Sequence, residues 1–394
     1  MNKLILCLIA GLLLATTTPA WARVKLITLP VRQHVEVQLD HAQATLIEEE
    51  RIVPLVKGRN QVDFSWANTA IDPGTIVFRV LGPADGKAMT ANVIAMNYPP
   101  GENALVWDVF ANRSGNVRVR ISYLLGGLNK SFNYRAVVSA DEKTLDLSQY
   151  LKVKNFANEA FKDTLIYAGL GDRFHQPIGL NQSREMLMKR YANVPVVKTF
   201  TCNLATYGYL DPAQQKLNVP MHYVLTNSDS HQLGIDPLPA GKVRLFQKDS
   251  QGTTAFLGED WGTFTPLNND MKLYLGQSQD IVVKRTVNDR KRTRVAGNLY
   301  RAEVVIKYEI ENFKDAPATL NIEEIVNQLA NEAGVPTGRP LEWIVGDQTT
   351  FTHRPIADET NLQHITYAVS LEPRQGDAAK KVVRQLHLIF KNVW

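Results

Sequence analysis

The densest cluster of charge in the chain is a group of basic residues in its last third. Its members are Lys284, Arg285, Arg290, Lys291, Arg292 and Arg294. Ammonium and guanidinium groups bind phosphate and carboxylate groups, and arginine often does so with two parallel hydrogen bonds. No aromatic residues are interleaved with the cluster, which argues against a platform for single-stranded nucleic acid. We therefore predict that these six residues bind an acidic partner, and that nucleic acid is not that partner.

The cluster falls between two runs of strand-forming residues. If residues 288–298 form a hairpin loop, the basic side chains project from one end of a sheet and meet anionic groups there. The alternative is a solvated loop whose mutual charge repulsion keeps the end of the sheet from aggregating.

Residues that could form a catalytic or metal site are scattered. The eight histidines are His34, His41, His175, His222, His231, His353, His364 and His387. None has the spacing of a zinc-binding helix, no cysteine pair accompanies them, and the chain has no G-x-S-x-G or S-x-x-K motif. We therefore predict no catalytic residues, no metal and no cofactor. Two alternatives stay open: strand-borne histidines such as His387 that hold a metal together, and a catalytic site that converges only in three dimensions.

Three further short stretches have a chemical and a structural interpretation. Gly169–Asp172 follows a strand as a phosphate-binding loop does, but it lacks the Lys-Ser/Thr of a P-loop and favours a turn. Glu48–Glu50 and Glu259–Asp260 bring carboxylates together, but the paired acids of glycosidases come from separate segments. We interpret both acidic stretches as solvated strand ends.

The first 22 residues are typical of a signal peptide. Lys3 supplies a positive charge, Leu4–Ala15 is apolar, and Ala20-Trp21-Ala22 fits the small-x-small cleavage rule. The mature chain is expected to start at Arg23 and to be periplasmic or extracellular. No later apolar run is long enough to predict a transmembrane segment in the mature chain.

Removal of Cys7 with the signal peptide leaves Cys202 as the sole cysteine. A lone cysteine forms no intramolecular disulfide, so Cys202 is expected to be a buried thiol, with an intermolecular bridge or a reactive thiol as alternatives. The formal charge of +5 and the pI near 9.0 permit contact with acidic polymers or lipid head groups.

The elements that would position these residues are mostly strands. Apolar and polar residues alternate with period two from Val24 to about Val138, as in sandwich strands with one buried face. Four further runs are predicted to form one antiparallel meander: Lys242–Gln247, Thr253–Trp261, Met271–Leu275 and Asp280–Arg285.

Two segments interrupt the strand pattern. Residues 172–193 are predicted to be a loop, with a helical turn starting near Ser183. Ile322, Ile325, Val326 and Leu329 have helical spacing, so we predict a helix from Asn321 to Gly334 with Asn321 and Glu324 as a capping box.

The predicted fold is all-β, with two or more antiparallel β-sandwich-like domains and one short helix near the C-terminus. We divide the chain into a signal peptide (residues 1–22), an N-terminal β-rich part (residues 23–193) and a C-terminal β-sandwich domain (residues 194–394).

Parts of the chain resemble a known group of bacterial proteins. The stretches that carry the resemblance are Gly241–Asp249, Phe256–Asp260, Thr265–Pro266, Lys272–Gly276, Asp280–Val283 and Glu303–Asn312. They are similar to a C-terminal domain of unknown function in proteins related to the mucoidy inhibitor A group. Gly58–Val62, Ile71–Pro73 and Leu105–Trp107 resemble the β-rich region that precedes it. Many members insert a coiled-coil hairpin, which this chain lacks, so a partner role tied to that hairpin does not carry over.

The resemblance implies an all-β architecture and an envelope location, and it supplies no catalytic residues. The expected function is therefore that of an exported, non-enzymatic protein of the bacterial cell envelope with a structural or binding role. Its expected partner is an envelope protein or an acidic envelope polymer, and no oligomeric state follows from the pattern. The alternative is a hydrolase of envelope polymers.

Overall fold

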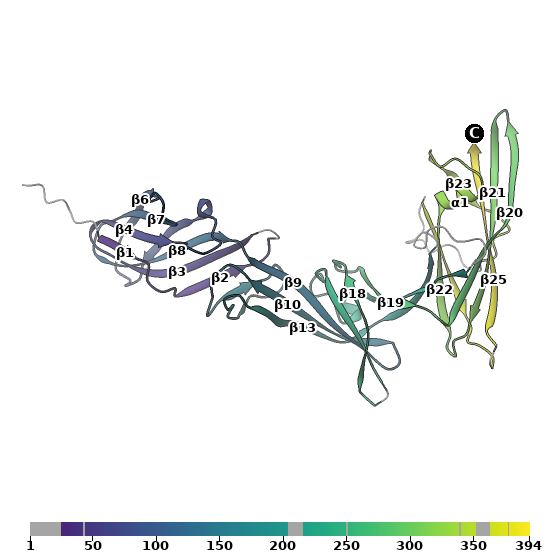
Figure 1. The fold of residues 1–394 in the computed structure, drawn as a ribbon, viewed down its shortest axis with the longest axis horizontal. Coiled ribbons are helices and arrows are strands. Elements are labelled where there is room, and N and C mark those ends of the chain that lie inside the picture. Colours follow the sequence, from purple (N-terminus) through teal and green to yellow (C-terminus); the bar gives the residue numbers. More distant parts are fainter. Residues whose placement is uncertain are drawn as a thin grey trace, which may run out of the picture. The chain divides into compact units, whose positions relative to one another are not determined.

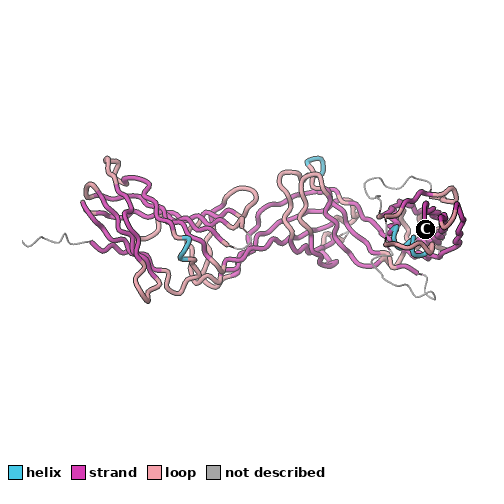
Figure 2. Tube along the Cα trace, turned by 90° about the horizontal axis from the view of Figure 1, so that it is seen from above, coloured by secondary structure: helices cyan, strands magenta, loops and turns pink. Residues whose placement is uncertain are grey.

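The structure is a computed structural model (Figure 1) that describes residues 25–41, 44–203, 216–249, 251–338, 340–351, 363–376 and 378–394. The predicted signal peptide lies outside these residues. Strands and loops make up nearly all of the described chain (Figure 2), and its single α-helix is α1 (Val326–Glu332). The prediction of an all-β fold with one short helix near the C-terminus is confirmed.

The chain divides into two compact units. The first comprises Met1–Lys130 and Val153–Arg184, and the second comprises Ser131–Lys152 and Glu185–Trp394. The predicted domain boundary between residues 193 and 194 stays a prediction, and that position lies within a strand, β13 (Ser183–Pro195).

Two sheets form the first unit. The four-stranded sheet has the order β1 (Lys25–Thr28), β4 (Gly58–Ser65), β7 (Ala104–Ala111) and β6 (Ala91–Asn97). The six-stranded sheet has the order β12 (Phe174–His175), β11 (Leu165–Tyr167), β2 (His34–Gln38), β3 (Thr45–Leu55), β8 (Gly115–Leu125) and β5 (Val77–Pro83), with η1 (Pro73–Thr75) leading into β5. Phe64 lies 5.9 Å from Tyr123 and Phe78 lies 4.5 Å from Trp107 between ring centroids, so the two sheets share one aromatic core.

The second unit contains three five-stranded sheets. One has the order β13, β10 (Thr144–Asn155), β9 (Leu128–Val138), β17 (Gly241–Lys248) and β18 (Thr254–Gly262). The next has the order β19 (Asp270–Gln277), β16 (Pro220–Thr226), β14 (Val197–Asn203), β22 (Ala318–Ile325) and β24 (His364–Leu371). The last has the order β15 (Lys216–Leu217), β20 (Ile281–Ala296), β21 (Leu299–Asn312), β25 (Lys380–Val393) and β23 (Glu342–Val345). A 3-10 turn, η3 (Asp229–His231), follows β16.

The last two of these sheets and α1 share one hydrophobic core. Phe200 and Ile322 come from one sheet, Ile306 and Leu388 from the other, and Leu329 from α1, and all five are at most 3% exposed. Cys202 is buried in the same core, as predicted. Alternate residues of each strand enter this core, which is why the period-two pattern was informative.

The four strands of the predicted meander exist, but the meander does not. β17 and β18 belong to one sheet, β19 to a second and β20 to a third. β17 pairs in parallel with β9, whereas β19 pairs with β16 and β20 pairs with β21. The prediction was wrong because a period-two pattern fixes which face of a strand is buried and says nothing of its distant partner.

Two local predictions were also wrong. Residues 183–190, predicted as a loop with a helical turn, belong to strand β13. The helix was predicted to begin at Asn321, but α1 begins five residues later, at Val326. Asn321–Ile325 belong to strand β22 instead, and α1 has no side-chain cap. Parallel pairing of Cys202 with Ile322 supplies the backbone hydrogen bonds of this segment, and Glu324 faces inward in register with Ile322, so tertiary pairing outweighs the helical spacing.

Candidate functional site

The predicted basic loop is a strand. β20 continues to Ala296 and pairs with β21 along nearly its whole length, with a tight turn at Gly297, whose φ is 52°. The loop interpretation was wrong because Arg290–Arg294 has cross-strand partners of good β propensity in β21, such as Val304 opposite Arg290. The basic residues therefore occupy fixed positions on a hairpin (Figure 1).

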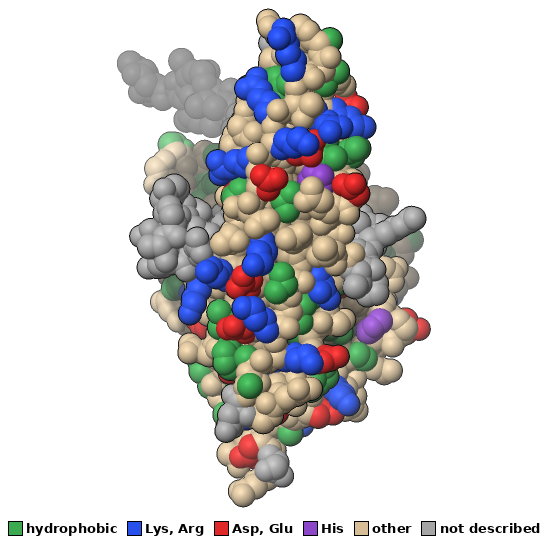
Figure 3. Space-filling view, turned by 90° about the vertical axis from the view of Figure 1, so that its right-hand side faces the viewer, with side chains coloured by type: hydrophobic (Ala, Val, Ile, Leu, Met, Phe, Trp, Pro, Cys, Tyr) green, Lys and Arg blue, Asp and Glu red, His purple; other side chains and the backbone are tan. Residues whose placement is uncertain are grey.

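Strand geometry divides these residues between two faces. Arg290, Arg292 and Arg294 pair with Val304, Ala302 and Tyr300, whereas Lys291 pairs with Glu303. Residues paired across two strands point to the same side, so the three arginines form one row and Lys291 faces the other way. All four basic side chains are exposed. Figure 3 shows Lys and Arg side chains gathered at the end where Figure 1 places the tip of this hairpin, with acidic side chains more frequent below.

Two of the three arginines are held in place by contacts that do not neutralise their charge. The guanidinium carbon of Arg292 lies 3.3 Å from the ring centroid of Tyr300. The Nε of Arg294 donates to the carbonyl oxygen of Gly297 at 2.7 Å. Residues 290–302 include no Asp or Glu, and within the described chain none of the three arginines pairs with a carboxylate. We call Arg290, Arg292 and Arg294 the arginine row.

Arg285 does not belong to this surface. Its Nε donates to Glu324 at 2.7 Å and its Nη2 to Glu332 at 2.8 Å, and it is 7% exposed. Burial alone would lower the pKa of Arg285, but the adjacent Glu324, the neighbouring Tyr308 and the hydrogen bonds from Glu332 and Glu324 raise it overall. Lys284, the neighbour of Arg285 in the chain, is exposed and lies opposite Glu309 in the register of β20 and β21. Burial of Arg285 thus removes one of the six predicted binding residues from the surface.

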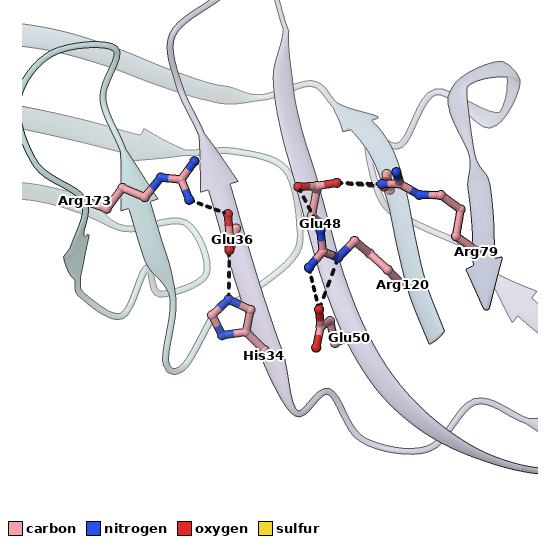
Figure 4. Close-up of polar contacts among 8 residues, drawn as sticks. His34, Glu36, Glu48, Glu50, Arg79, Arg120 and Arg173 are labelled. Atoms are coloured by element: carbon pink, nitrogen blue, oxygen red, sulfur yellow. Dashed lines mark hydrogen bonds and ion pairs between the residues drawn. The ribbon is translucent and has the colours of Figure 1, made fainter. Parts of the chain in front are cut away.

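A second charged array crosses the six-stranded sheet of the first unit (Figure 4). Glu36 accepts from Arg173 at 3.2 Å and lies 3.1 Å from His34, Glu48 accepts from Arg79 at 2.9 Å, and Glu50 accepts from Arg120 at 2.6 Å. Each of these three carboxylates already faces an arginine. The array is therefore neutralised from within and is a structural feature of the sheet.

The interpretation of Glu48–Glu50 as a solvated strand end was wrong. All three residues lie in the middle of β3, where Glu48 and Glu50 belong to this array and Glu49 points to the opposite face. Glu49 is fully buried and accepts hydrogen bonds from Arg32 and Arg51.

A groove of about 740 Å³ lies on the face of β19, β16, β14 and β22 that points away from the core. Its lining includes Thr199 and Thr201 of β14, His222 of β16, Tyr274 of β19 and Asn321 of β22. Ring centroids of His222 and Tyr274 are 5.6 Å apart. No stretch of the sequence predicts this groove, although polar residues alternate in Thr199–Asn203. Their signal is weak because a polar face of a strand also occurs on any solvated sheet.

Side chains in the groove are hydrogen-bonded to neutral neighbours, and His231 Nδ1 lies 2.7 Å from the hydroxyl of Ser228. Asp270 accepts from Thr226 at 2.7 Å, and Glu323 accepts from Asn203 at 2.6 Å. Burial lowers the pKa of His222, with the charge of Asp260 opposing this shift and that of Lys272 adding to it. Within the described chain neither His222 nor His231, the groove's two histidines, hydrogen-bonds to a carboxylate.

His387, the histidine singled out in the sequence, lies on the face of β25 that points away from the core, because Leu386 and Leu388 on either side of it enter that core. Gly346, Gln348 and Thr349 form hydrogen bonds with His387 on this outer face. Its Nε2 is 3.1 Å from Glu303 Oε2, and the side chain is 2% exposed. The described residues contain no group of three His, Cys, Asp or Glu placed to hold a metal ion. His387 and Glu303 therefore act as a buried polar pair between β25 and β21.

Comparison with protein-family models finds no matching family, and comparison with curated proteins finds no matching relative. The resemblance to the mucoidy inhibitor A group stays a prediction. None of the helices in the described part of the chain is both long and apolar enough to span a membrane.

Proposed function

We propose that this chain is an exported, non-enzymatic β-sandwich protein of the bacterial cell envelope that binds an acidic envelope polymer through the arginine row. One observation carries the proposal. Arg290, Arg292 and Arg294 project from one face of a paired hairpin, and within the described chain none of them forms an ion pair with a carboxylate. Asp289, which precedes the row, accepts a hydrogen bond from the backbone N–H of Arg290.

The regular spacing of the row suits a repeating anion. Alternate residues of a strand are separated by about 6.6 Å, so three guanidinium groups meet successive phosphate or carboxylate groups of an extended polymer. Tyr300 orients Arg292 by lying beneath its guanidinium plane, which reduces the side-chain entropy lost on binding. Binding of this kind weakens as salt screens the charges.

The envelope location rests on the predicted signal peptide and on the resemblance described above. The non-enzymatic role is supported by the groove of the second unit, where Asp270 and Glu323 are engaged by neutral side chains. A general base that works near neutral pH would instead require a positioned and activated group.

The test compares binding of residues 23–394 to poly(glycerol phosphate) and to polygalacturonate at low and high salt. The triple variant Arg290→Ala/Arg292→Ala/Arg294→Ala removes the row. Its matched control, Lys57→Ala/Lys87→Ala/Lys162→Ala, removes the same charge from exposed positions of the first unit.

We expect loss of the row to weaken binding by about tenfold or more at low salt, which corresponds to ~1.4 kcal/mol, while the control binds as the parent does. Equal losses in both variants would mean that net charge alone attracts the polymer. No binding of either polymer by the parent protein would also overturn the proposal.

A further inference from the structure

We propose that the groove on β19, β16, β14 and β22 binds a linear, uncharged oligosaccharide. The groove shares no residue with the arginine row, and this inference does not depend on the function proposed for that row. Its volume of about 740 Å³ falls within the range of roughly 300–1,000 Å³ that is typical of ligand-binding pockets.

Register places the lining residues in rows across the sheet. Tyr274 pairs with His222, which pairs with Thr199, so these three side chains lie side by side. In the next row Thr201 pairs with Asn321. An aromatic pair thus lies beside a row of hydroxyl and amide groups. A sugar ring has the same two kinds of surface, because its C–H face packs on aromatic rings and its hydroxyls form hydrogen bonds.

The hydroxyl and amide groups of the two rows are available to a ligand. The side chains of Thr199, Thr201 and Asn321 form no hydrogen bond within the described chain, although each is half-buried. A half-buried hydroxyl or amide without a protein partner relies on water, and a ligand hydroxyl replaces that water with little loss. The lining includes three charged residues, Asp270, Lys272 and Glu323, and the two carboxylates accept hydrogen bonds from Thr226 and Asn203. The other polar side chains of the groove are neutral donors and acceptors and outnumber the charged ones.

The position of the groove on a sheet face favours a sugar over an extended peptide. Strand-like peptides obtain their affinity from the free main-chain groups of a sheet edge. In this groove β14 and β16 are internal strands whose main-chain groups already pair with neighbours on both sides. β19, which also lines the groove, is the edge strand of this sheet. A ligand that lies over β14 and β16 meets side chains, and a hydroxyl-rich chain matches them better than a peptide backbone.

The experiment presents residues 23–394 to an array of linear tetrasaccharides that includes chitotetraose, cellotetraose and maltotetraose, with an acetylated tetra-alanine peptide as the competing class. Affinities are then measured by calorimetry for two groove variants, Tyr274→Ala and Thr201→Val/Asn321→Leu. The matched controls are Phe256→Ala, an exposed aromatic residue of β18, and Thr254→Val, an exposed hydroxyl residue of the same strand.

We expect at least one tetrasaccharide to bind, each groove variant to lose about tenfold or more in affinity, and both controls to bind as the parent does. The variant lacking the arginine row should keep its sugar affinity, which separates this proposal from the previous one. Failure of every tetrasaccharide to bind, preference for the peptide, or equal binding by groove and control variants would each overturn the inference. Melting temperatures confirm that the variants are folded.

Discussion

Arg285 holds a positive charge inside the hydrophobic core of the C-terminal sandwich. Glu324 and Glu332 compensate that charge, and Tyr308 donates a hydrogen bond to Glu324. The four residues come from β20, β22, α1 and β21, so the cluster joins both sheets and the helix. A buried ion pair adds little compared with apolar packing, but removal of one partner leaves an uncompensated charge.

Replacement of Arg285 by Met should therefore destabilise the protein by about 3–5 kcal/mol, since Glu324 would stay buried without its partner. Urea unfolding measures the loss. Lys284→Met removes a charge from the adjacent, exposed position and should cost no more than about 0.5 kcal/mol. The double variant Arg285→Met/Glu324→Leu should recover part of the loss. Equal stability of the two single variants would contradict a structural role for the cluster.

Glu309 is expected to titrate far below an ordinary glutamate. Hydrogen bonds and charge from Lys307 and Lys381 lower its pKa to about 2, and the Nζ–Oε distances are 2.7 and 3.1 Å. Because the pKa is lower in the folded chain, the resulting stabilisation is present above the ordinary glutamate pKa and is lost as pH falls toward 2.

Lys381→Met should raise the pKa of Glu309, which an NMR titration of its carboxyl carbon reads directly. Lys391→Met, on the same strand but outside this contact, should leave that pKa unchanged. An unaltered titration in the Lys381 variant would show that this lysine does not hold the carboxylate.

Among the secondary-structure elements, the parallel pairing of β17 with β9 depends on one small residue. A Cβ atom at Gly241 would lie 2.2 Å from the carbonyl oxygen of Phe132, which is the residue paired with it. Gly258, in the neighbouring strand β18, has open space around the same position. The two glycines thus form a matched pair for testing the close approach of the strands.

Gly241→Ala should destabilise the protein by about 1–3 kcal/mol, because the backbone of β9 or β17 must move to make room. Gly258→Ala should stay within about 0.5 kcal/mol of the parent. Thermal unfolding followed by circular dichroism distinguishes the two. A Gly241→Ala protein as stable as the parent would mean that the two strands separate without cost.

Period-two alternation was sufficient to predict most strands and the all-β class, because burial of every second residue leaves a local trace. β4 and β10 show this pattern over most of their lengths. The pairing of one strand with another leaves no such local trace. The sheet to which each strand of the expected meander belongs was therefore not predictable. The helix was placed too early for a related reason: Ile322 fits a helix and a strand equally well, and only its pairing with Cys202 decides.

The candidate site was predictable only in part. The basic residues could be recognised from their types. Their positions in the sequence do not show that they lie on two opposite faces of a strand. Whether Arg285 is inside or outside depends on Glu324 and Glu332, which lie 39 and 47 residues away. The groove is lined by side chains of β14, β16, β19 and β22. These strands are far apart in the sequence, so no single stretch predicts the groove.

At the scale of the whole molecule, the division of the chain at residue 193 can be tested with fragments. Residues 23–193 include β9 but not β17, its neighbour. Tyr134 of β9 would also lose its acceptor, the carbonyl oxygen of Pro239 at 2.7 Å. The fragment would therefore expose a long, unpaired strand edge, which promotes association.

We expect residues 23–193 to form larger assemblies in light scattering than residues 23–262, which retain β17 and β18. A monomeric, cooperatively folding shorter fragment would contradict this expectation and would support a domain boundary at that position.

Cys202 can serve as a chemical probe for opening of the hydrophobic core in which it is buried. The thiol is 1% exposed, and burial raises its pKa, so a maleimide reaches it only when the surrounding core opens. After removal of the first 22 residues it is the sole thiol of the chain, so mass spectrometry of the labelled protein would follow a single event. The labelling rate under native conditions would then give the opening free energy of this core with no mutation introduced.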